Sequence, residues 1–89
     1  MPSAIESLAD LQREIADTYL ARDRARGVPA TVAWIAEEVG ELAQAVRKGT
    51  REQQLHELGD VLAWLASLAN QLDLSLDDAM ARYRDNPPL

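Results

Sequence analysis

Two stretches of this 89-residue chain place acidic residues at the same spacing. Glu38 and Glu41 lie three positions apart, as do Glu57 and Asp60, and each pair encloses a glycine. Because a helix turns by about 100° per residue, each pair would lie along one border of the apolar stripe of its helix. Antiparallel packing of the two stripes would bring all four carboxylates to the edge of one helical seam.

Four carboxylates that converge in a partly buried place need a countercharge, because they cannot all stay ionised without one. Mg²⁺ would supply that charge, since it takes oxygen ligands and keeps coordination positions for water and substrate phosphates. Such a site suits phosphoryl chemistry, in which bound metals neutralise phosphate charge and activate a water. The alternative is that the acids simply face solvent, as acidic pairs commonly do in a chain with 27% charged residues.

The glycine inside each pair, Gly40 or Gly59, is unusual in a helical phrase. A mid-helix glycine costs about 1 kcal/mol relative to alanine. This repeated cost indicates that another backbone or a ligand comes close to each glycine.

Several further residues are candidates for contact with a substrate. Trp34 and Trp64 fall on the acidic borders of their helices, where they serve either as packing at the core edge or as substrate contacts. Lys48 lies in the basic turn 47–51, which is either a solvated helix end or a phosphate contact. The single histidine, His56, is interpreted as a solvated residue.

The elements that carry these residues are expected to be helices throughout. Leu and Ala dominate the composition and both favour helix. Ser3, Thr31, Thr50 and Ser75 are the expected N-caps, and Gly27 breaks the pattern between the first two helices. We therefore expect an all-α, four-helix bundle-like fold with antiparallel neighbours. The predicted helices span about 3–25, 31–48, 50–72 and 75–85.

Size and charge narrow the function further. A 9.8 kDa chain is expected to form a single domain over 1–89 that buries only about 60–65% of its unfolded surface. With no cysteine for disulfides, self-association is the expected support. A net charge of −6 disfavours nucleic acid or an anionic membrane as the main partner. Without a long apolar run or a signal peptide pattern, we expect a cytoplasmic protein.

The acidic phrases resemble a known family. WIAEEVGELA at 34–43, followed by ELGDVL at 57–62, is similar to the E-x-x-E…E-x-x-D signature of the MazG-type nucleotide pyrophosphohydrolases, in the all-α nucleoside triphosphate pyrophosphatase superfamily. The tail from Arg82 to Asn86 resembles the K-x-x-x-N element of that family, with arginine in place of lysine. The resemblance covers about residues 28–86.

This resemblance implies a Mg²⁺-dependent enzyme, with Mn²⁺ as an alternative ion, that assembles as a homodimer or a dimer of dimers. It implies hydrolysis of a nucleoside triphosphate to the monophosphate and pyrophosphate. The cellular role stays open between nucleotide-pool housecleaning and nucleotide signalling. Glu37 matches a general base or a ligand of a further metal. Lys48, Arg82 and Asn86 match substrate contacts, and Trp34 and Trp64 stand beside them as candidates. The implied metal ligands are Glu38, Glu41, Glu57 and Asp60.

Two alternatives stay open at the level of sequence. One is a related branch of the superfamily that acts on phosphoribosyl-ATP, dUTP or dCTP. The other is a catalytically idle helical dimer that serves as an interaction or regulatory module, with its acids solvated. The sequence does not identify the nucleobase or sugar, the number of metals, the general base, the cellular role, or the choice between dimer and tetramer.

Overall fold

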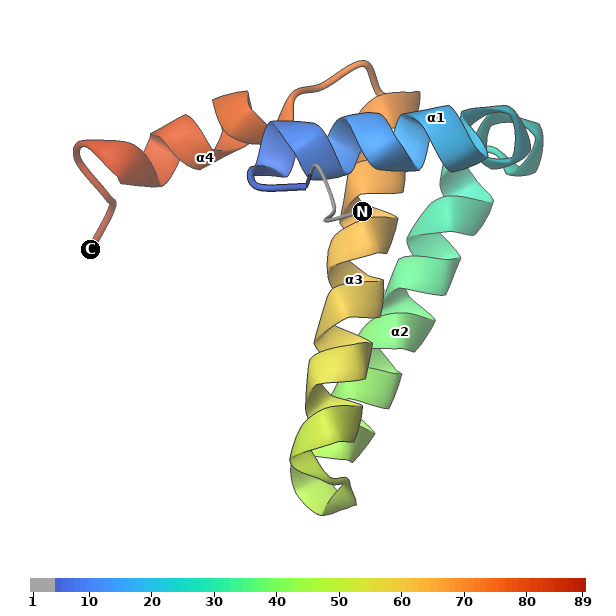
Figure 1. The fold of residues 1–89 in the computed structure, drawn as a ribbon, viewed down its shortest axis with the longest axis vertical. Coiled ribbons are helices and arrows are strands. Elements are labelled where there is room, and N and C mark those ends of the chain that lie inside the picture. The colour runs from blue at the N-terminus through green and yellow to red at the C-terminus, as the bar shows by residue number, and fades with distance from the viewer. Residues whose placement is uncertain (1–4) are drawn as a thin grey trace.

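The computed structural model describes residues 5–89, which contain four helices and no strand. This confirms the all-α prediction. Two long helices form a hairpin, and the other two lie across one end of it (Figure 1). The helices are α1 (Leu8–Arg26), α2 (Val28–Lys48), α3 (Arg51–Gln71) and α4 (Leu76–Arg84).

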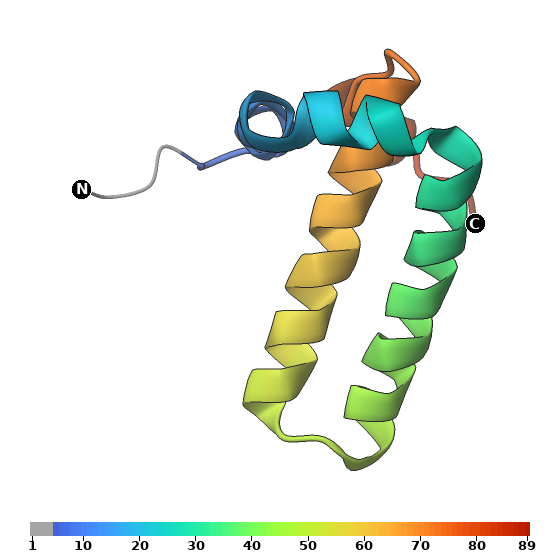
Figure 2. The ribbon, with the colours of Figure 1, turned by 90° about the vertical axis from the view of Figure 1, so that its right-hand side faces the viewer.

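The hairpin of α2 and α3 is antiparallel, as expected, and its two helices pack along their length (Figure 2). Thr50 caps α3 in the predicted capping box: its hydroxyl accepts from the Gln53 amide at 3.1 Å, and the Gln53 side chain accepts from the Thr50 amide at 2.7 Å. Gly49 is required before this cap, because a Cβ there would lie 2.8 Å from the Ala45 carbonyl oxygen. This turn sets the register of α2 against α3.

Gly27 forms the corner between α1 and α2. Its φ of 92° lies in the region that favours glycine, and α2 begins directly after it with Pro29 in the first turn. The predicted N-cap, Thr31, instead lies inside α2 and is fully buried. Its hydroxyl donates to the Gly27 carbonyl at 2.9 Å, so Thr31 secures the corner from within the helix. The predicted start of this helix at 31 was therefore three residues late.

The first helix also begins elsewhere than predicted. Residues 5–7 are not helical, and Ser7 is the N-cap, with its side chain accepting from the Asp10 amide at 3.1 Å. The expected cap, Ser3, lies outside the described residues. The Ser75 cap of α4 is confirmed, because its hydroxyl accepts from the Asp78 amide.

The arrangement of α1 and α4 differs from a bundle in which neighbours run antiparallel. A single corner residue turns α1 across the end of the hairpin, and α4 points away from it (Figures 1 and 2). Gln12 ties the start of α4 to α1: its side chain donates to the Leu74 carbonyl at 2.6 Å and accepts from the Leu76 amide at 2.9 Å. One chain therefore forms a hairpin with a crossing helix and a projecting arm.

Few large apolar side chains are buried in this arrangement. The buried apolar residues of the described chain are Ala45, Ala66 and Ala69. By contrast, α3 exposes a row of leucines at alternating spacings of three and four residues, from Leu55 at 72% exposure to Leu65 at 40%. The members of this leucine row are Leu55, Leu58, Leu62 and Leu65. Within residues 5–89, no helix combines the length and the apolar character needed to cross a membrane.

Candidate metal centre and adjoining cavities

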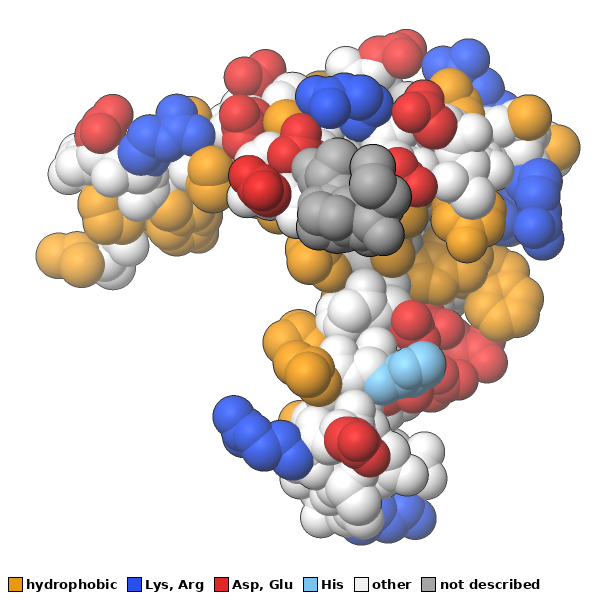
Figure 3. Space-filling model, in the orientation of Figure 1, with side chains coloured by type: hydrophobic (Ala, Val, Ile, Leu, Met, Phe, Trp, Pro, Cys, Tyr) orange, Lys and Arg blue, Asp and Glu red, His pale blue; other side chains and the backbone are white. Residues whose placement is uncertain are grey.

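The α2–α3 hairpin brings the predicted acids together. One carboxylate oxygen from each of Glu38, Glu41 and Glu57 lies within 4.8 Å of the other two. Glu57 also belongs to a second group, in which ligand atoms of His56, Glu57 and Asp60 lie within the same distance. Acidic side chains gather beside the histidine partway along the hairpin (Figure 3). We call Glu38, Glu41, Glu57 and Asp60 the acidic cluster.

The acidic cluster is electrostatically strained. Burial raises the pKa of Glu38, and the charges of Glu41, Asp60 and Glu57 raise it further. Burial also raises the pKa of Glu57. The charges of Glu41 and Asp60 raise this pKa further, and His56 lowers it. Within residues 5–89, the Oε2 atoms of Glu38 and Glu57 are buried and have no hydrogen-bond partner. Protein groups alone therefore leave these carboxylates incompletely satisfied.

These residues fit a hard divalent cation. Such ions take carboxylate oxygens as ligands, and Mg²⁺ is held by a few carboxylates with water completing its shell. A cation among Glu38, Glu41 and Glu57 would offset the mutual repulsion of carboxylates, two of which keep an oxygen without a hydrogen bond in the described chain.

His56 is exposed, as its interpretation as a solvated residue requires, yet it has a specific neighbour. Its Nε2 lies 3.3 Å from Asp60 Oδ2, one helical turn along α3. The histidine is therefore placed to hold the Asp60 side chain at the edge of the acidic cluster, although 70% of the imidazole surface remains accessible.

A cavity of about 290 Å³ adjoins the acidic cluster between α1 and α3. Asp60 links the two features, because it lines the cavity and belongs to the cluster. The wall contributed by α1 is charged and aromatic, and sequence analysis did not identify it. Its charged members lie in the run Arg22 to Arg26, whose alternating charges are typical of a solvated face. The lining from α1 consists of Ile15, Tyr19, Arg22, Asp23 and Arg26.

Trp34 and Trp64 meet across the hairpin. Their rings stack with centroids 6.2 Å apart and planes 12° from parallel. The guanidinium of Arg26 lies 4.7 Å from the centroid of the Trp64 ring, in a cation–π contact. Trp64 lines the cavity, whereas Trp34 is about half exposed at 46%. The two indoles therefore connect α2, α3 and the end of α1 beside the acids.

A second cavity, of about 430 Å³, lies toward the turn of the hairpin. Lys48 lines it together with Glu41 and Glu57 of the acidic cluster. An ammonium group and carboxylates that share one cavity could bind opposite ends of a metal–phosphate group.

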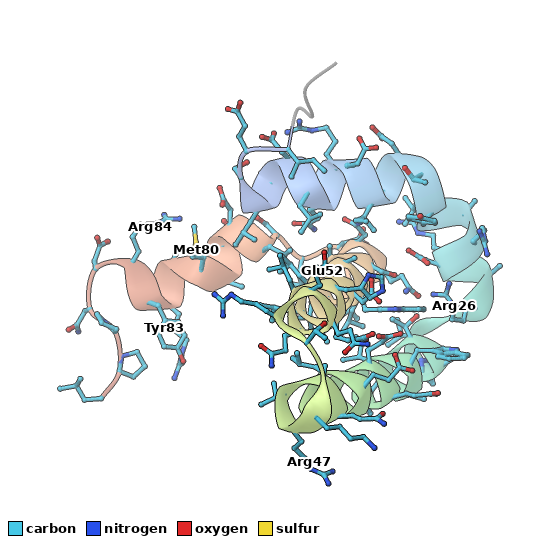
Figure 4. The ribbon with its side chains drawn as sticks, turned by 60° about the horizontal axis from the view of Figure 1, so that its bottom comes forward. Arg26, Arg47, Glu52, Met80, Tyr83 and Arg84 are labelled. Carbon is cyan, nitrogen blue, oxygen red and sulfur yellow. The ribbon has the colours of Figure 1, made fainter. Side chains whose placement is uncertain are left out.

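The remaining candidates lie apart from these cavities. Glu37 is exposed on α2, one residue from Glu38. Arg82 lies on α4 with its guanidinium 5.6 Å from the Tyr83 ring centroid, and Asn86 follows the end of that helix. Because α4 packs on α1 and extends away from the hairpin, a single chain does not bring Arg82 or Asn86 to the acidic cluster (Figures 1 and 4).

Comparison with known proteins agrees with the geometry. The family model of the MazG nucleotide pyrophosphohydrolase domain matches residues 26–85, which include all four acids and α4. The chain is also 35% identical to the uncharacterized protein YpjD of Bacillus subtilis, over 86% of this chain and 79% of the relative.

Proposed function

The chain belongs to the MazG nucleotide pyrophosphohydrolase domain family, and from this premise we propose that it hydrolyses nucleoside triphosphates, or their deoxy forms, to a monophosphate and pyrophosphate. Mg²⁺ is the proposed cofactor, with Mn²⁺ as an alternative. The observation that supports this function best is the acidic cluster, in which Glu38 and Glu57 each keep one buried oxygen without a partner. Nucleotide-pool housecleaning is the role we propose.

The acidic cluster would hold the metal, with Glu38, Glu41 and Glu57 as the central ligands and Asp60 at the edge toward the α1–α3 cavity. When bound, the metal offsets the charge of the phosphates and makes water a better nucleophile. Glu37 is the proposed general base, because it is exposed beside Glu38 and free to take a proton from water. Its removal should lower kcat without abolishing metal binding.

The two cavities divide the substrate between them. Lys48 would bind phosphate oxygens in the cavity at the turn, where it is close to Glu41 and Glu57. The nucleoside end would enter the α1–α3 cavity, which begins at Asp60 and has Trp64 in its wall. The α–β phosphate linkage would then lie at the acidic cluster between the two cavities.

We propose that two copies of the chain pair through the leucine row of α3. The alternating spacing of three and four residues is typical of helices that pack against another helix, yet the chain covers this row only partly. Apolar side chains also lie along the underside of α4 (Figure 3). Pairing would let α4 carry Arg82 and Asn86 to the substrate of the partner copy.

The proposed function is tested by removing each acid in turn. In alanine variants of the four cluster acids, kcat/KM should fall by more than the roughly 10–100-fold that follows removal of a residue that only hydrogen-bonds a metal ligand. Glu14→Ala, which removes an exposed acid of α1, is the control and should keep near-normal activity. Far-UV circular dichroism should report unchanged helix in all variants. Near-normal rates in three of the four cluster variants would refute the metal site.

A further inference from the structure

The wall of the α1–α3 cavity contains a third buried polar atom without a hydrogen-bond partner in the described chain, at Asp23. This residue is only 3% exposed, although aspartate is rarely buried. Its Oδ1 accepts from Arg26 Nη1 at 3.0 Å, whereas its Oδ2 is buried and receives no hydrogen bond from any described residue. A buried carboxylate oxygen without a donor is costly, so its persistence in a cavity wall indicates that a ligand supplies the missing N–H.

The surroundings of Asp23 hold it in place. Arg26 is fixed on its other side by its contact with the Trp64 ring and lies 3.4 Å from the Thr31 hydroxyl. Thr31 in turn accepts from Gln71 Nε2 at 2.8 Å, which joins this network to α3. Arg26 lies at the corner where α1 meets α2, on the opposite side of the molecule from Met80, Tyr83 and Arg84 of α4 (Figure 4). Because these contacts fix Arg26, Arg26 in turn holds the Asp23 carboxylate in one orientation as a hydrogen-bond acceptor.

The chemistry of the cavity suits a nucleobase edge. Ile15 and Tyr19 offer apolar surface, while Asp23 offers a free acceptor beside the donors of Arg26. An exocyclic amino group can donate directly to Asp23 Oδ2. Uracil and thymine offer only a ring N–H between two carbonyl oxygens, and those oxygens would be repelled by the carboxylate.

We propose that Asp23, oriented by Arg26, accepts a hydrogen bond from the amino group of the substrate base, so that the chain selects cytosine and adenine nucleotides over their oxo counterparts. This inference rests on the proposed function, since it places the base of the same substrate. Asp23 acts here as a specificity-determining residue and takes no part in the cleavage step.

Matched substrate pairs provide the test. CTP and UTP differ by an amino group in place of an oxygen, and so do ATP and ITP. For the wild-type protein with Mg²⁺, kcat/KM should favour the amino member of each pair by roughly 10–100-fold, the range expected for a hydrogen bond to a charged group. Equal kcat/KM within both pairs would overturn the proposal and leave the proposed hydrolysis intact.

The variant Asp23→Asn sharpens the test. Its amide can keep an oxygen toward Arg26 and present N–H donors to the base, so the preference within each pair should shrink or reverse. A role limited to stability would lower both members equally, which would also overturn the proposal. Asp17→Asn, an exposed change on the same helix, should leave the ratios unchanged. Circular dichroism checks that the variants fold.

Binding separates this inference from failure of the proposed reaction. The affinities of the non-hydrolysable α,β-methylene analogues of CTP and UTP can be measured by titration calorimetry, with no turnover. Tighter binding of the CTP analogue, lost in Asp23→Asn, would support the base contact even if neither nucleotide is hydrolysed. Equal affinity for the two analogues would refute the contact.

Discussion

Glu38 and Glu57 each bury one carboxylate oxygen without a hydrogen bond. Their raised pKa values mean that the folded protein holds protons on these groups more tightly than the unfolded chain does. Their protonation therefore favours the folded state fully below the ordinary value of 4.5, and this contribution is lost as the pH rises through the raised values. At neutral pH the two glutamates should destabilise the metal-free fold and bind a cation.

Glu57→Gln tests this balance between stability and binding. Without metal at neutral pH, the variant should melt at a higher temperature than wild type, because it removes a poorly solvated charge. The difference should shrink as the pH falls toward 4.5, because the raised pKa lets the wild-type glutamate gain its proton in the folded protein above that pH. Differential scanning fluorimetry with and without Mg²⁺ should show stabilisation of wild type only.

Glu14→Gln is the matched control for that measurement, since it removes an exposed charge from α1. It should leave the response to Mg²⁺ intact. Equal stabilisation of wild type and Glu57→Gln by Mg²⁺ would contradict the assignment of Glu57 as a ligand.

At the scale of elements, the space around Gly40 and Gly59 differs from the space around Gly49. A Cβ on Gly40 or Gly59 would meet no atom within 4 Å in the described chain, whereas one on Gly49 would clash with the Ala45 backbone. The close neighbour expected at Gly40 and Gly59 is therefore not supplied by the described part of the same chain. Gly59 lies between Leu58 and Leu62 of the exposed leucine row, so a partner copy could supply it.

Gly59→Ala distinguishes these surroundings. Helix propensity alone would raise stability by about 1 kcal/mol, or about 4–8 °C in Tm for a chain of this size. We expect weaker self-association or lower kcat/KM in spite of that gain, measured by sedimentation and by nucleotide hydrolysis. A more stable variant with unchanged association and activity would show that nothing approaches Gly59. Gly49→Ala should simply destabilise the protein, by on the order of 1–3 kcal/mol.

Local signals predicted the elements well and their arrangement less well. The caps at Thr50 and Ser75 were readable, because each side chain reaches the amide three residues later. Thr31 was misread as a cap, because a threonine after a Gly–Val–Pro break also suits a first helical turn. The crossing of α1 depends on the φ of Gly27 and on contacts with α3, which sequence spacing does not encode.

The same limit applies to the candidate site. The meeting of the four acids followed from helical phase and antiparallel packing, both visible in the spacing. Asp23 and Arg26 carried no such signal. Asp23 is buried and Arg26 is partly buried, and Arg26 packs on the ring of Trp64, which is far away in sequence. Residues that gain a role only through tertiary contact look like ordinary surface charges in the sequence.

At the scale of the whole molecule, an exposed leucine row and a projecting α4 suggest an incomplete assembly. Leu58→Glu combined with Leu62→Glu should convert a dimer or larger oligomer into a monomer, because it places two charges in the proposed interface. Analytical ultracentrifugation gives the masses directly. Leu89→Glu, the same substitution at a fully exposed residue, is the matched control. A wild-type protein that sediments as a monomer would contradict the proposed pairing.

The central claim is that the acidic cluster supports cleavage between the α- and β-phosphates of a nucleotide. The most direct measurement is chromatographic identification of the products formed from a panel of NTPs and dNTPs, with Mg²⁺ and with chelator. We predict a monophosphate and pyrophosphate in equal amounts, in the Mg²⁺ samples only. Release of a nucleoside diphosphate and inorganic phosphate would contradict the claim. So would the absence of product from every nucleotide together with a protein that Mg²⁺ does not stabilise, and that result would favour a catalytically idle helical module.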